Sequence, residues 1–586
     1  MPNFDFSSEG IDEKLKELKS KNASVSFLRI LSFFGLIGFF ILFLSENPLW
    51  GVPFAFVVWV FIRLINYYNR QKDQEAIYLS IKKMDSELVQ RKARNLSEFS
   101  SGTEFLDKAH PFTNDLDLFG DHSLFQLLNE TSSNRGRNLL AERLKSSFDS
   151  VKAEEWRQSV DELKENRSFL RSMISVGKAF YQQPKEIKWS DWLSREEKIK
   201  SWLWPAAIIG PLGGLVLLAL IYASIIPASF LGLWILIGMI FLGVVFRPLK
   251  QAYENIPSRH ELKTFRYWVN ILEEQSFQSK LLQKSQSPFL ASESKASEIL
   301  RKLDGFGLWM QNRINLLYIP LNLLFWTDLW LYLSFEGWRK KNGKSLSNYP
   351  KALSEWEVWN SLGYFQSEIG FPGEFKDLKE GVEAKGINHP LLLPEKSIAN
   401  NFEQNYSSQV ILLTGANMSG KTTFMRTLGI NMVLVNIGLR PFAEEFGFGP
   451  CQLYTSMRNT DNLGESVSSF YAELSRIKKL IDRSESGESM YFLLDEILKG
   501  TNTEDRIAGS EALIKQITNT KAMGIISTHD IELAELSKKE KSVKNHSFHS
   551  EVKDETIDFD YTLKEGPCPS FNAHKLMELM GIRFQN

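Results

Sequence analysis

The sequence predicts a multidomain protein: an α-helical core with two transmembrane helical hairpins, followed by a C-terminal α/β domain. Three observations predict this fold class. The chain has 586 residues, which is too long for one compact core. Long apolar runs occur in two close pairs in the first half of the chain. A glycine-rich segment lies between a strand pattern and a helical pattern at the start of the last third.

The composition places few limits on function. The chain has 69 Lys and Arg against 70 Asp and Glu, so its net charge of −1 does not by itself indicate a nucleic-acid partner. Its two cysteines, Cys451 and Cys568, allow at most one disulfide and are typical of a reducing compartment. Many of its 42 Phe and 15 Trp residues lie in the apolar runs, which raises the question of a membrane.

The apolar runs are Phe27–Ser45, Trp50–Ile65, Trp202–Ile225 and Ala228–Phe246. Each is close to the ~20 residues that cross a bilayer as a helix. The short connection inside each pair carries no Lys or Arg, whereas the outer flanks do. The positive-inside rule therefore predicts that both hairpins cross outward and return, which leaves both termini on the cytoplasmic side of the inner membrane. The alternative, four buried core helices, is disfavoured by the pairing and the charge asymmetry.

A fifth apolar run, Leu316–Phe335, contains Asn322, Thr327 and Asp328. A charged side chain near the centre of a helix is costly in lipid. An odd number of spans would also place the glycine-rich segment outside the cell. We therefore predict a buried soluble helix for this run.

These patterns divide the chain into consecutive segments. They are a cytoplasmic tail (1–25), a first hairpin (26–68), a helical region (69–200), a second hairpin (201–247), a second helical region (248–370) and a domain of alternating strands and helices (371–586).

The glycine-rich segment fits the phosphate-loop pattern G-x-x-x-x-G-K-[ST] through Gly415, Gly420, Lys421 and Thr422. Its amides and the following helix N-terminus would form an anion cradle. We expect Lys421 to contact the β- and γ-phosphates of ATP and Thr422 to bind Mg²⁺. The nucleotide-binding residues predicted from this loop are Gly415, Asn417, Met418, Ser419, Gly420, Lys421, Thr422 and Thr423.

Two later strand patterns end in polar residues suited to ATP hydrolysis. Met490–Leu494 is followed by Asp495, a predicted partner of Mg²⁺, and by Glu496, which would orient the attacking water. The strand pattern over residues 524–527 is followed by Thr528 and His529. His529 is a candidate sensor of the γ-phosphate, although a single histidine at a strand end is also often structural.

Longer segments around these residues resemble the MutS family of ATPases. Residues 415–426 (GANMSGKTTFMR), 495–503 (DEILKGTNT) and 527–530 (STHD) resemble its phosphate loop, its DE-x-x-x-G-T-[SN]-T run and its T-H switch. Residues 461–463 and 468–473 resemble its signature segment and lack the LSGGQ sequence of transporter cassettes. The resemblance covers about 110–200 and 250–586, and it is close from 386 onward.

The resemblance implies a MutS-like, ABC-type phosphate-loop ATPase domain that uses ATP and Mg²⁺. It implies that Ser468 reaches the γ-phosphate of the partner subunit's ATP, so the expected assembly is a homodimer through the ATPase domains. Glu496, His529 and Ser468 are then the expected catalytic residues, and Thr422 and Asp495 the expected metal-binding ones.

The sequence departs from the family in several places. A membrane hairpin stands where the family has its mismatch-reading domain, and the second hairpin stands where its DNA clamp would follow. Phe442–Glu444 matches the Phe-x-Glu pattern of the family's wedge but lies inside the ATPase region. Ser397 stands where an aromatic residue usually stacks on adenine, with Ile398 as an alternative apolar contact. We expect no C-terminal dimerisation extension or nuclease-like tail before Asn586.

Two functions remain open for the helical core. One is binding of mismatched, branched or damaged DNA, as the family resemblance implies for DNA mismatch repair. The other is mechanochemical action on a membrane protein partner without DNA. The resemblance slightly favours DNA, and the missing wedge and clamp weaken that preference.

Overall fold

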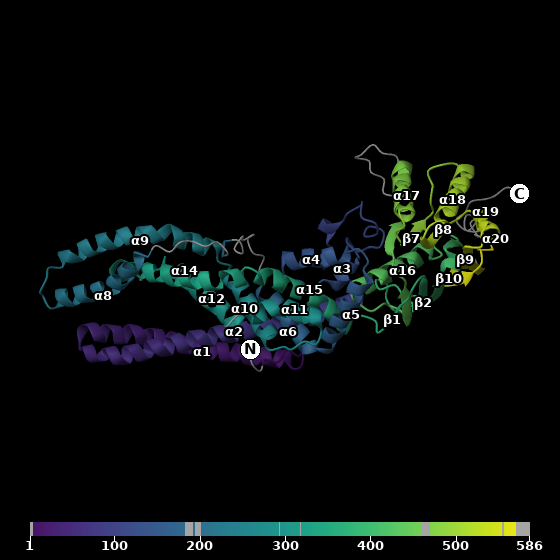
Figure 1. Cartoon of the computed structure of the whole chain (residues 1–586). Helices are drawn as coiled ribbons and strands as arrows, with labels where there is room; N and C mark the ends of the chain where they lie inside the picture. The colour runs from purple at the N-terminus through teal and green to yellow at the C-terminus, as the bar shows by residue number, and fades with distance from the viewer. Residues whose placement is uncertain are drawn as a thin grey trace. The chain divides into compact units, whose positions relative to one another are not determined.

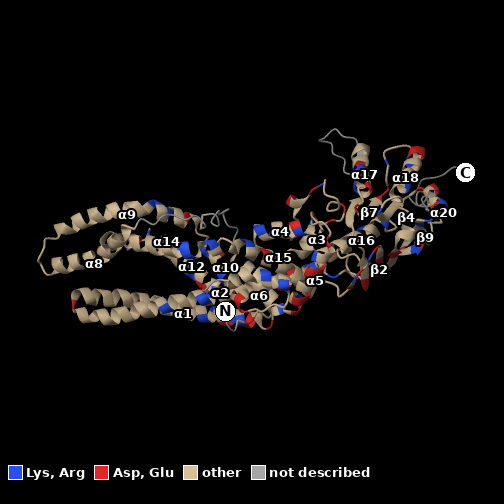
Figure 2. Ribbon diagram, in the orientation of Figure 1, with Lys and Arg blue, Asp and Glu red and all other residues tan. Residues whose placement is uncertain are grey.

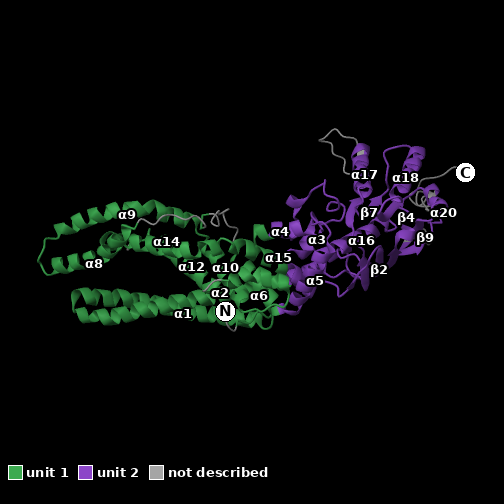
Figure 3. Cartoon of the chain, viewed as in Figure 1, with its two compact units in different colours: residues 1–85, 131–136, 168–360 green, residues 86–130, 137–167, 361–586 purple. Residues whose placement is uncertain are grey.

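The computed structural model describes residues 4–181, 192–193, 201–291, 294–316, 318–458, 469–553 and 556–569. The chain forms two compact units, coloured separately in Figure 3. Unit 1 comprises residues 1–85, 131–136 and 168–360, and unit 2 comprises residues 86–130, 137–167 and 361–586. The two β-sheets belong to unit 2, whereas the regular elements described in unit 1 are helical.

The first hairpin consists of α1 (Ile11–Ser45), the short η1 (Pro48–Trp50) and α2 (Gly51–Lys92). Both long helices extend beyond the predicted hairpin segment 26–68, because their polar flanks contain no residue that stops a helix. The most apolar window of each has none of its residues buried. Figure 2 shows that charged residues are sparse at the apolar end of this hairpin and frequent at its other end.

The second hairpin consists of α8 (Leu203–Tyr222) and α9 (Ser229–Asn255). Together with α1 and the segment Pro48–Lys92, these helices are the four in the described residues that are long and apolar enough to cross a membrane. The sequence predicted the same four runs. The four helices qualify as candidate spans by their length and composition.

The prediction of one buried helix over Leu316–Phe335 is wrong. The run forms α13 (Tyr318–Phe325) and the start of α14 (Thr327–Leu346), with a break at Trp326, whose φ is 50°. The side chain of Asn322 causes the break locally, since its Oδ1 accepts hydrogen bonds from Thr327 Oγ1 and from the Asp328 N–H. No residue of α13 is fully buried, whereas α14 buries much of its length.

The other helices before the first strand, most of which are labelled in Figure 1, lie in both units, as Figure 3 shows. They are η2 (Thr103–Phe105), α3 (Leu124–Leu128), α4 (Asn134–Leu144), α5 (Ser150–Glu165), α6 (Arg167–Phe180), α10 (Arg259–Glu273), α11 (Lys280–Leu290), α12 (Ala296–Asn312) and α15 (Tyr349–Glu368). Several carry one apolar face; in α10 the buried side chains Leu262, Phe265, Val269 and Leu272 recur at helical spacing.

Unit 2 contains a six-stranded sheet in the order β10-β9-β4-β8-β7-β6. Its strands are β4 (Val410–Gly415), β6 (Gln452–Ser456), β7 (Met490–Asp495), β8 (Met523–Thr528), β9 (Val543–Lys553) and β10 (Thr556–Glu565). The pairings are parallel except that of β10 with β9. Strand β4 is buried along its whole length, which explains the uninterrupted apolar run over its first four residues, Val410–Leu413.

A four-stranded sheet in the order β1-β5-β2-β3 accompanies it. Its strands are β1 (Glu374–Asp377), β2 (Val382–Ile387), β3 (Asn400–Gln404) and β5 (Glu445–Phe448), with η3 (Tyr406–Ser408) after β3. The helices of this part are α16 (Lys421–Asn436), α17 (Ser469–Glu485), α18 (Thr503–Ile517), α19 (Ile531–Ala534) and α20 (Leu536–Lys539). In the six-stranded sheet β8 separates β4 from β7, so the carboxyl ends of three parallel strands meet at one edge.

Candidate nucleotide-binding site

The loop after β4 leads into the N-terminus of α16 at this edge. Gly420 caps the helix with φ 104°, a left-handed conformation that favours glycine. Lys421 is buried, and its Nζ donates hydrogen bonds to the carbonyl oxygens of Gly415 (2.8 Å) and Ala416 (2.9 Å). Burial lowers the pKa of Lys421 from its usual value. The ammonium group is therefore held inside the loop that surrounds it.

Thr422 lies next to the carboxylate predicted to share a metal ion with it. Its Oγ1 donates a 2.6 Å hydrogen bond to Asp495 Oδ2, and Ser527 Oγ donates to the other oxygen of that carboxylate. The pairing of β7 with β8 places Asp495 opposite Ser527. The sheet register thus fixes the carboxylate beside the start of α16.

Glu496 and His529 form a second polar pair at the same edge. His529 Nε2 lies 2.8 Å from Glu496 Oε1, and Lys499 forms an ion pair with the other carboxylate oxygen. The hydrogen bond from His529 and that from Lys499 outweigh burial and lower the pKa of Glu496 to about 2. Glu496 is therefore a carboxylate at neutral pH, which is the form that can accept a proton or orient water.

The backbone around this edge contains left-handed residues other than glycine. Met418, Glu496 and Leu498 have φ values of 66°, 50° and 60°. The Leu498 N–H donates a hydrogen bond to Glu473 Oε1 in α17. Burial raises the pKa of Glu473. Such conformations are unfavourable by about 1–3 kcal/mol each and concentrate at functional sites.

The structure places the other predicted loop residues in two groups. Asn417, Met418 and Thr423 are exposed, and the exposed fraction of Met418 is 81%. Ser419 is buried, and its Oγ has no hydrogen-bond partner in the described part of the chain. A buried hydroxyl without a partner at a loop of this kind fits a donor to phosphate.

Two further predictions have different outcomes. Ser468 and residues 461–463 lie outside the described residues. Ser397 Oγ accepts a hydrogen bond from the His389 N–H at 3.2 Å, which gives it a structural role in its own loop. Ile398 beside it is exposed.

Sequence reasoning missed Tyr561 as a site residue. A Cβ on Gly420 would lie 3.2 Å from the Tyr561 ring, so this side chain lies against the loop. Asn400 holds the position, because its Nδ2 donates to Tyr561 O and its Oδ1 accepts from the Leu563 N–H. The β9–β10 register shifts between Phe559 and Leu563, and no local sequence pattern marks that shift.

The geometry of this edge agrees with a comparison to known protein families. Residues 411–582 match the family model of MutS domain V. The match begins in β4 and includes the site residues from Gly415 to Tyr561. MutS domain V is the ATPase domain of the MutS family, whose members generally act as dimers. The match supports a MutS-family relationship for this region, and the described α/β sheet fits MutS domain V.

The residues present also fit Mg²⁺ with a nucleotide. No cluster of three or more His, Cys, Asp or Glu suited to a metal occurs among the described residues. Mg²⁺ in nucleotide sites needs only one or two protein oxygens in addition to phosphates and water. Thr422 Oγ1 and Asp495 supply such a pair, 2.6 Å apart.

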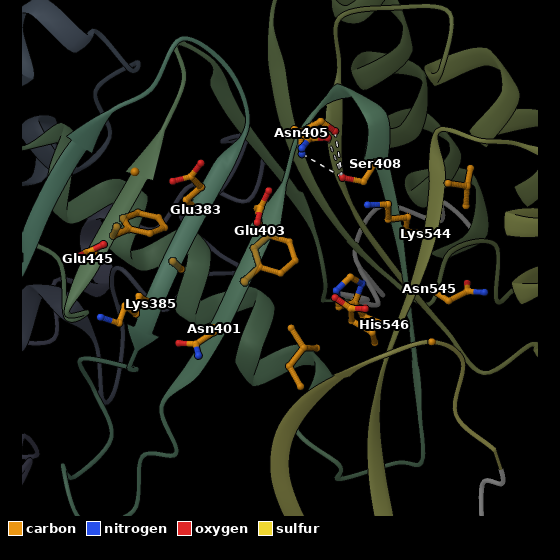
Figure 4. A pocket seen from close by; sticks show the side chains of 18 of the residues that line it. Glu383, Lys385, Asn401, Glu403, Asn405, Ser408, Glu445, Lys544, Asn545 and His546 are labelled. Atoms are coloured by element: carbon orange, nitrogen blue, oxygen red, sulfur yellow. Dashed lines mark hydrogen bonds between the residues drawn. The ribbon is translucent and has the colours of Figure 1, made fainter.

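A separate hollow of about 830 Å³ lies between the two sheets of unit 2 (Figure 4). Side chains of both charges line it, including Glu383, Lys385, Glu403, Glu445 and Lys544. None of the residues 415–423 lines it. Because it lacks the loop amides, we do not assign the nucleotide to this hollow.

Proposed function

We propose that this protein binds and hydrolyses ATP at the edge formed by β4, β7 and β8. The observation that carries the proposal is the contact between Thr422 at the start of α16 and Asp495 at the end of β7. That contact joins the phosphate-loop helix to the carboxylate strand. The match of residues 411–582 to MutS domain V supports the same activity.

Each side chain has a role in this proposal. Lys421, the loop amides and Ser419 Oγ hold the phosphates, and Thr422 and Asp495 bind Mg²⁺. Magnesium-bound ATP supplies a γ-phosphoryl group whose negative charge the metal partly neutralises. Glu496 orients the attacking water as a carboxylate, and His529 positions Glu496. Tyr561 offers an aromatic surface to the base in place of Ser397.

We further propose that the active form is a homodimer and is anchored in the cytoplasmic membrane. Ser468 of one subunit acts on the nucleotide of the other. In this proposal both termini and the ATPase site lie in the cytoplasm, and the distribution of Lys and Arg around the four candidate spans supports that orientation.

The test of the ATPase proposal is Lys421→Ala in the full chain, reconstituted in lipid nanodiscs. Loss of the ammonium group should reduce ATP turnover at least ~100-fold, because one charge-stabilising group typically contributes ~10²–10³ in kcat. Lys521→Ala is the matched control, since that lysine is exposed and outside the site. Equal turnover by the wild type and Lys421→Ala contradicts the assignment.

The target of the ATPase is a further proposal. We propose coupling to mismatched, branched or damaged DNA, on the basis of the MutS relationship. A membrane protein partner is the second candidate, and one observation favours it: within unit 1, α14 packs directly against the candidate spans α8 and α9. A movement of α14 would therefore be transmitted to the candidate spans α8 and α9 without the involvement of DNA.

Binding of the full chain in nanodiscs to duplex and branched DNA across a salt series separates the two targets. Contacts with several phosphates give a steep fall of log affinity with log salt. A slope of that kind supports DNA as the target. Absence of binding at low salt supports the membrane partner.

A further inference from the structure

The break between α13 and α14 is seated against the second hairpin. Within unit 1, α13 contacts α8 and α9, and α14 contacts the same two helices. The chain turns at Trp326, whose N–H still donates to Asn322 O at 2.8 Å. The elements involved are thus two candidate membrane spans and a short apolar segment far from them in sequence.

Glycines on α8 and α9 make room for this break. A Cβ on Gly210 would lie 2.9 Å from Trp326 Cβ, and one on Gly238 would lie 2.2 Å from Trp326 Nε1. A Cβ on Gly214 would lie 2.5 Å from Leu324 O. Any side chain at these positions would therefore collide with the break. Small residues that allow close approach of helices are typical of packing inside membranes.

Aromatic contacts also fix Trp326 in position at the break. Trp326 is 2% exposed and stacks on Trp234 at 4.6 Å and on Phe241 at 5.1 Å between ring centroids. Trp234 Nε1 also donates a 2.8 Å hydrogen bond to Leu324 O. This bond satisfies a carbonyl in the last turn of α13, where the helix itself supplies no donor.

The contacts lie well inside the apolar length of the hairpin. Gly210 comes seven residues after Leu203, the start of α8, which corresponds to ~10 Å of helix. Gly238 comes nine residues after Ser229, the start of α9 at the opposite end of the hairpin, which corresponds to ~14 Å. Both distances place Trp326 near the middle of a hydrocarbon layer ~30 Å thick.

Two polar side chains of the segment, Asp328 and Asn322, are paired, whereas the buried Nε1 of Trp326 has no hydrogen-bond partner among the described residues. Asp328 is buried and accepts from Arg313 through Nε (3.0 Å) and Nη2 (2.7 Å) and from Tyr318 Oη (2.8 Å). Asn322 Oδ1 accepts from Thr327 Oγ1 and from the Asp328 N–H. Charged and polar groups in a bilayer are tolerated when they face the protein interior and pair in this way.

Some apolar side chains in and just before the segment are exposed, whereas Leu329, Leu331 and Leu333 of α14 are buried. Those exposed are Ile314, Leu316, Ile319, Leu321 and Trp330. Exposed apolar residues of α8 and α9, including Ile208, Leu212 and Ile240, continue the same kind of surface. Lys340, Lys341 and Lys344 follow near the end of α14, as expected for a helix that returns to the cytoplasmic interface.

We propose that Tyr318–Leu333 is a re-entrant membrane element: it enters the bilayer from the cytoplasmic side, turns at Trp326 between α8 and α9, and returns to that side. Lipid acyl chains cover its exposed apolar face. Because the element enters and leaves on one side, it adds no span and leaves the ATPase site in the cytoplasm. This inference rests on the proposed membrane anchoring of the hairpins.

Cysteine accessibility tests the proposal in the full chain. In a Cys451→Ser, Cys568→Ser background, single cysteines replace Leu321 in α13, Ile240 in α9 and Leu290 in α11, all of which are exposed side chains. A membrane-impermeant maleimide is added to sealed inside-out vesicles. We expect Leu321→Cys and Ile240→Cys to react at least ~10-fold more slowly than Leu290→Cys, and all three to react alike in denaturing detergent.

The outcomes separate the two proposals. If Leu321→Cys reacts as fast as Leu290→Cys while Ile240→Cys stays protected, the re-entrant element is wrong and the anchoring stands. If Ile240→Cys also reacts fast, the anchoring itself is wrong. Reaction of Leu321→Cys with reagent confined to the outer side contradicts the return to the cytoplasmic side.

A glycine pair supplies an independent measurement. Gly238→Leu removes the space that Trp326 occupies, whereas Gly243→Leu in the same helix meets no described atom within 4 Å of its Cβ. In the Leu321→Cys protein, Gly238→Leu should increase the labelling rate and Gly243→Leu should leave it unchanged. Equal rates in both variants overturn the proposed seating of the break.

Discussion

Glu496 is the side chain on which the proposed chemistry depends most closely. Its pKa is lowered to about 2 by the hydrogen bonds from His529 and Lys499. Such a carboxylate stays ionised throughout the physiological range and is ready to orient water without a prior loss of a proton. We therefore propose that His529 acts on the reaction through Glu496, as a positioning residue.

The lowered pKa predicts how the contribution of Glu496 to stability depends on pH. A depressed folded-state pKa stabilises the protein above the unfolded-state value of ~4.3, and this contribution is lost as pH falls toward 2. Glu496→Gln should therefore lower the unfolding temperature most above pH 5, and the difference from wild type should shrink toward pH 3. Thermal unfolding across that range measures the difference.

The control for this pH series is Glu532→Gln, because Glu532 is exposed and lies in α19, shortly after the end of the neighbouring strand β8. Its unfolding temperature should follow the wild type at every pH. A Glu496→Gln difference that is constant across the range contradicts the electrostatic origin of the effect.

At the scale of elements, the C-terminal end of α16 depends on a close approach to α5. Gly438 has φ 92°, and a Cβ there would lie 2.6 Å from Trp156 Cβ. Gly438→Ala therefore combines a left-handed conformation with a collision. Gly487 has a similar φ of 88° but nothing within 4 Å, so Gly487→Ala isolates the conformational part. Both lie in unit 2.

We predict that Gly487→Ala destabilises the fold by ~1–2 kcal/mol, the range for an L-residue in this conformation. Gly438→Ala should be worse, because the surrounding helix must move to admit the methyl group. Thermal shift assays of the two variants measure the contrast. If Gly438→Ala is no less stable than Gly487→Ala, the contact with Trp156 does not constrain α16.

Local patterns accounted for the elements that carry the chemistry. The strand before Gly415, the helix after Lys421 and the strands before Asp495 and Thr528 each appear as short, self-contained patterns, so sequence reasoning located them. Tyr561 and the break at Trp326 depend on contacts with distant residues, namely Asn400 and the glycines of α8 and α9. Such contacts leave no periodic signal in the sequence.

At the scale of the whole molecule, the proposed ATPase site and the proposed membrane anchor belong to one chain. Four helices in the described residues meet the length and composition of membrane spans. We predict that the full chain remains with the membrane fraction after an alkaline carbonate wash. The wash disrupts electrostatic contacts with the membrane surface but does not extract apolar helices that span the bilayer. Immunoblotting of pellet and supernatant measures this. Release into the supernatant contradicts membrane anchoring and leaves the ATPase proposal intact.

The other proposals on function depend on ATP hydrolysis at the edge formed by β4, β7 and β8. The most direct test of this activity is ATP turnover by the full chain in nanodiscs, measured for the wild type and for Glu496→Gln together with equilibrium binding of ATP. We predict turnover by the wild type, and in Glu496→Gln a turnover at least ~100-fold lower with ATP binding retained, because that substitution removes the group that orients water and leaves the phosphate cradle. Absence of turnover in the wild type, or full turnover in Glu496→Gln, would contradict this prediction.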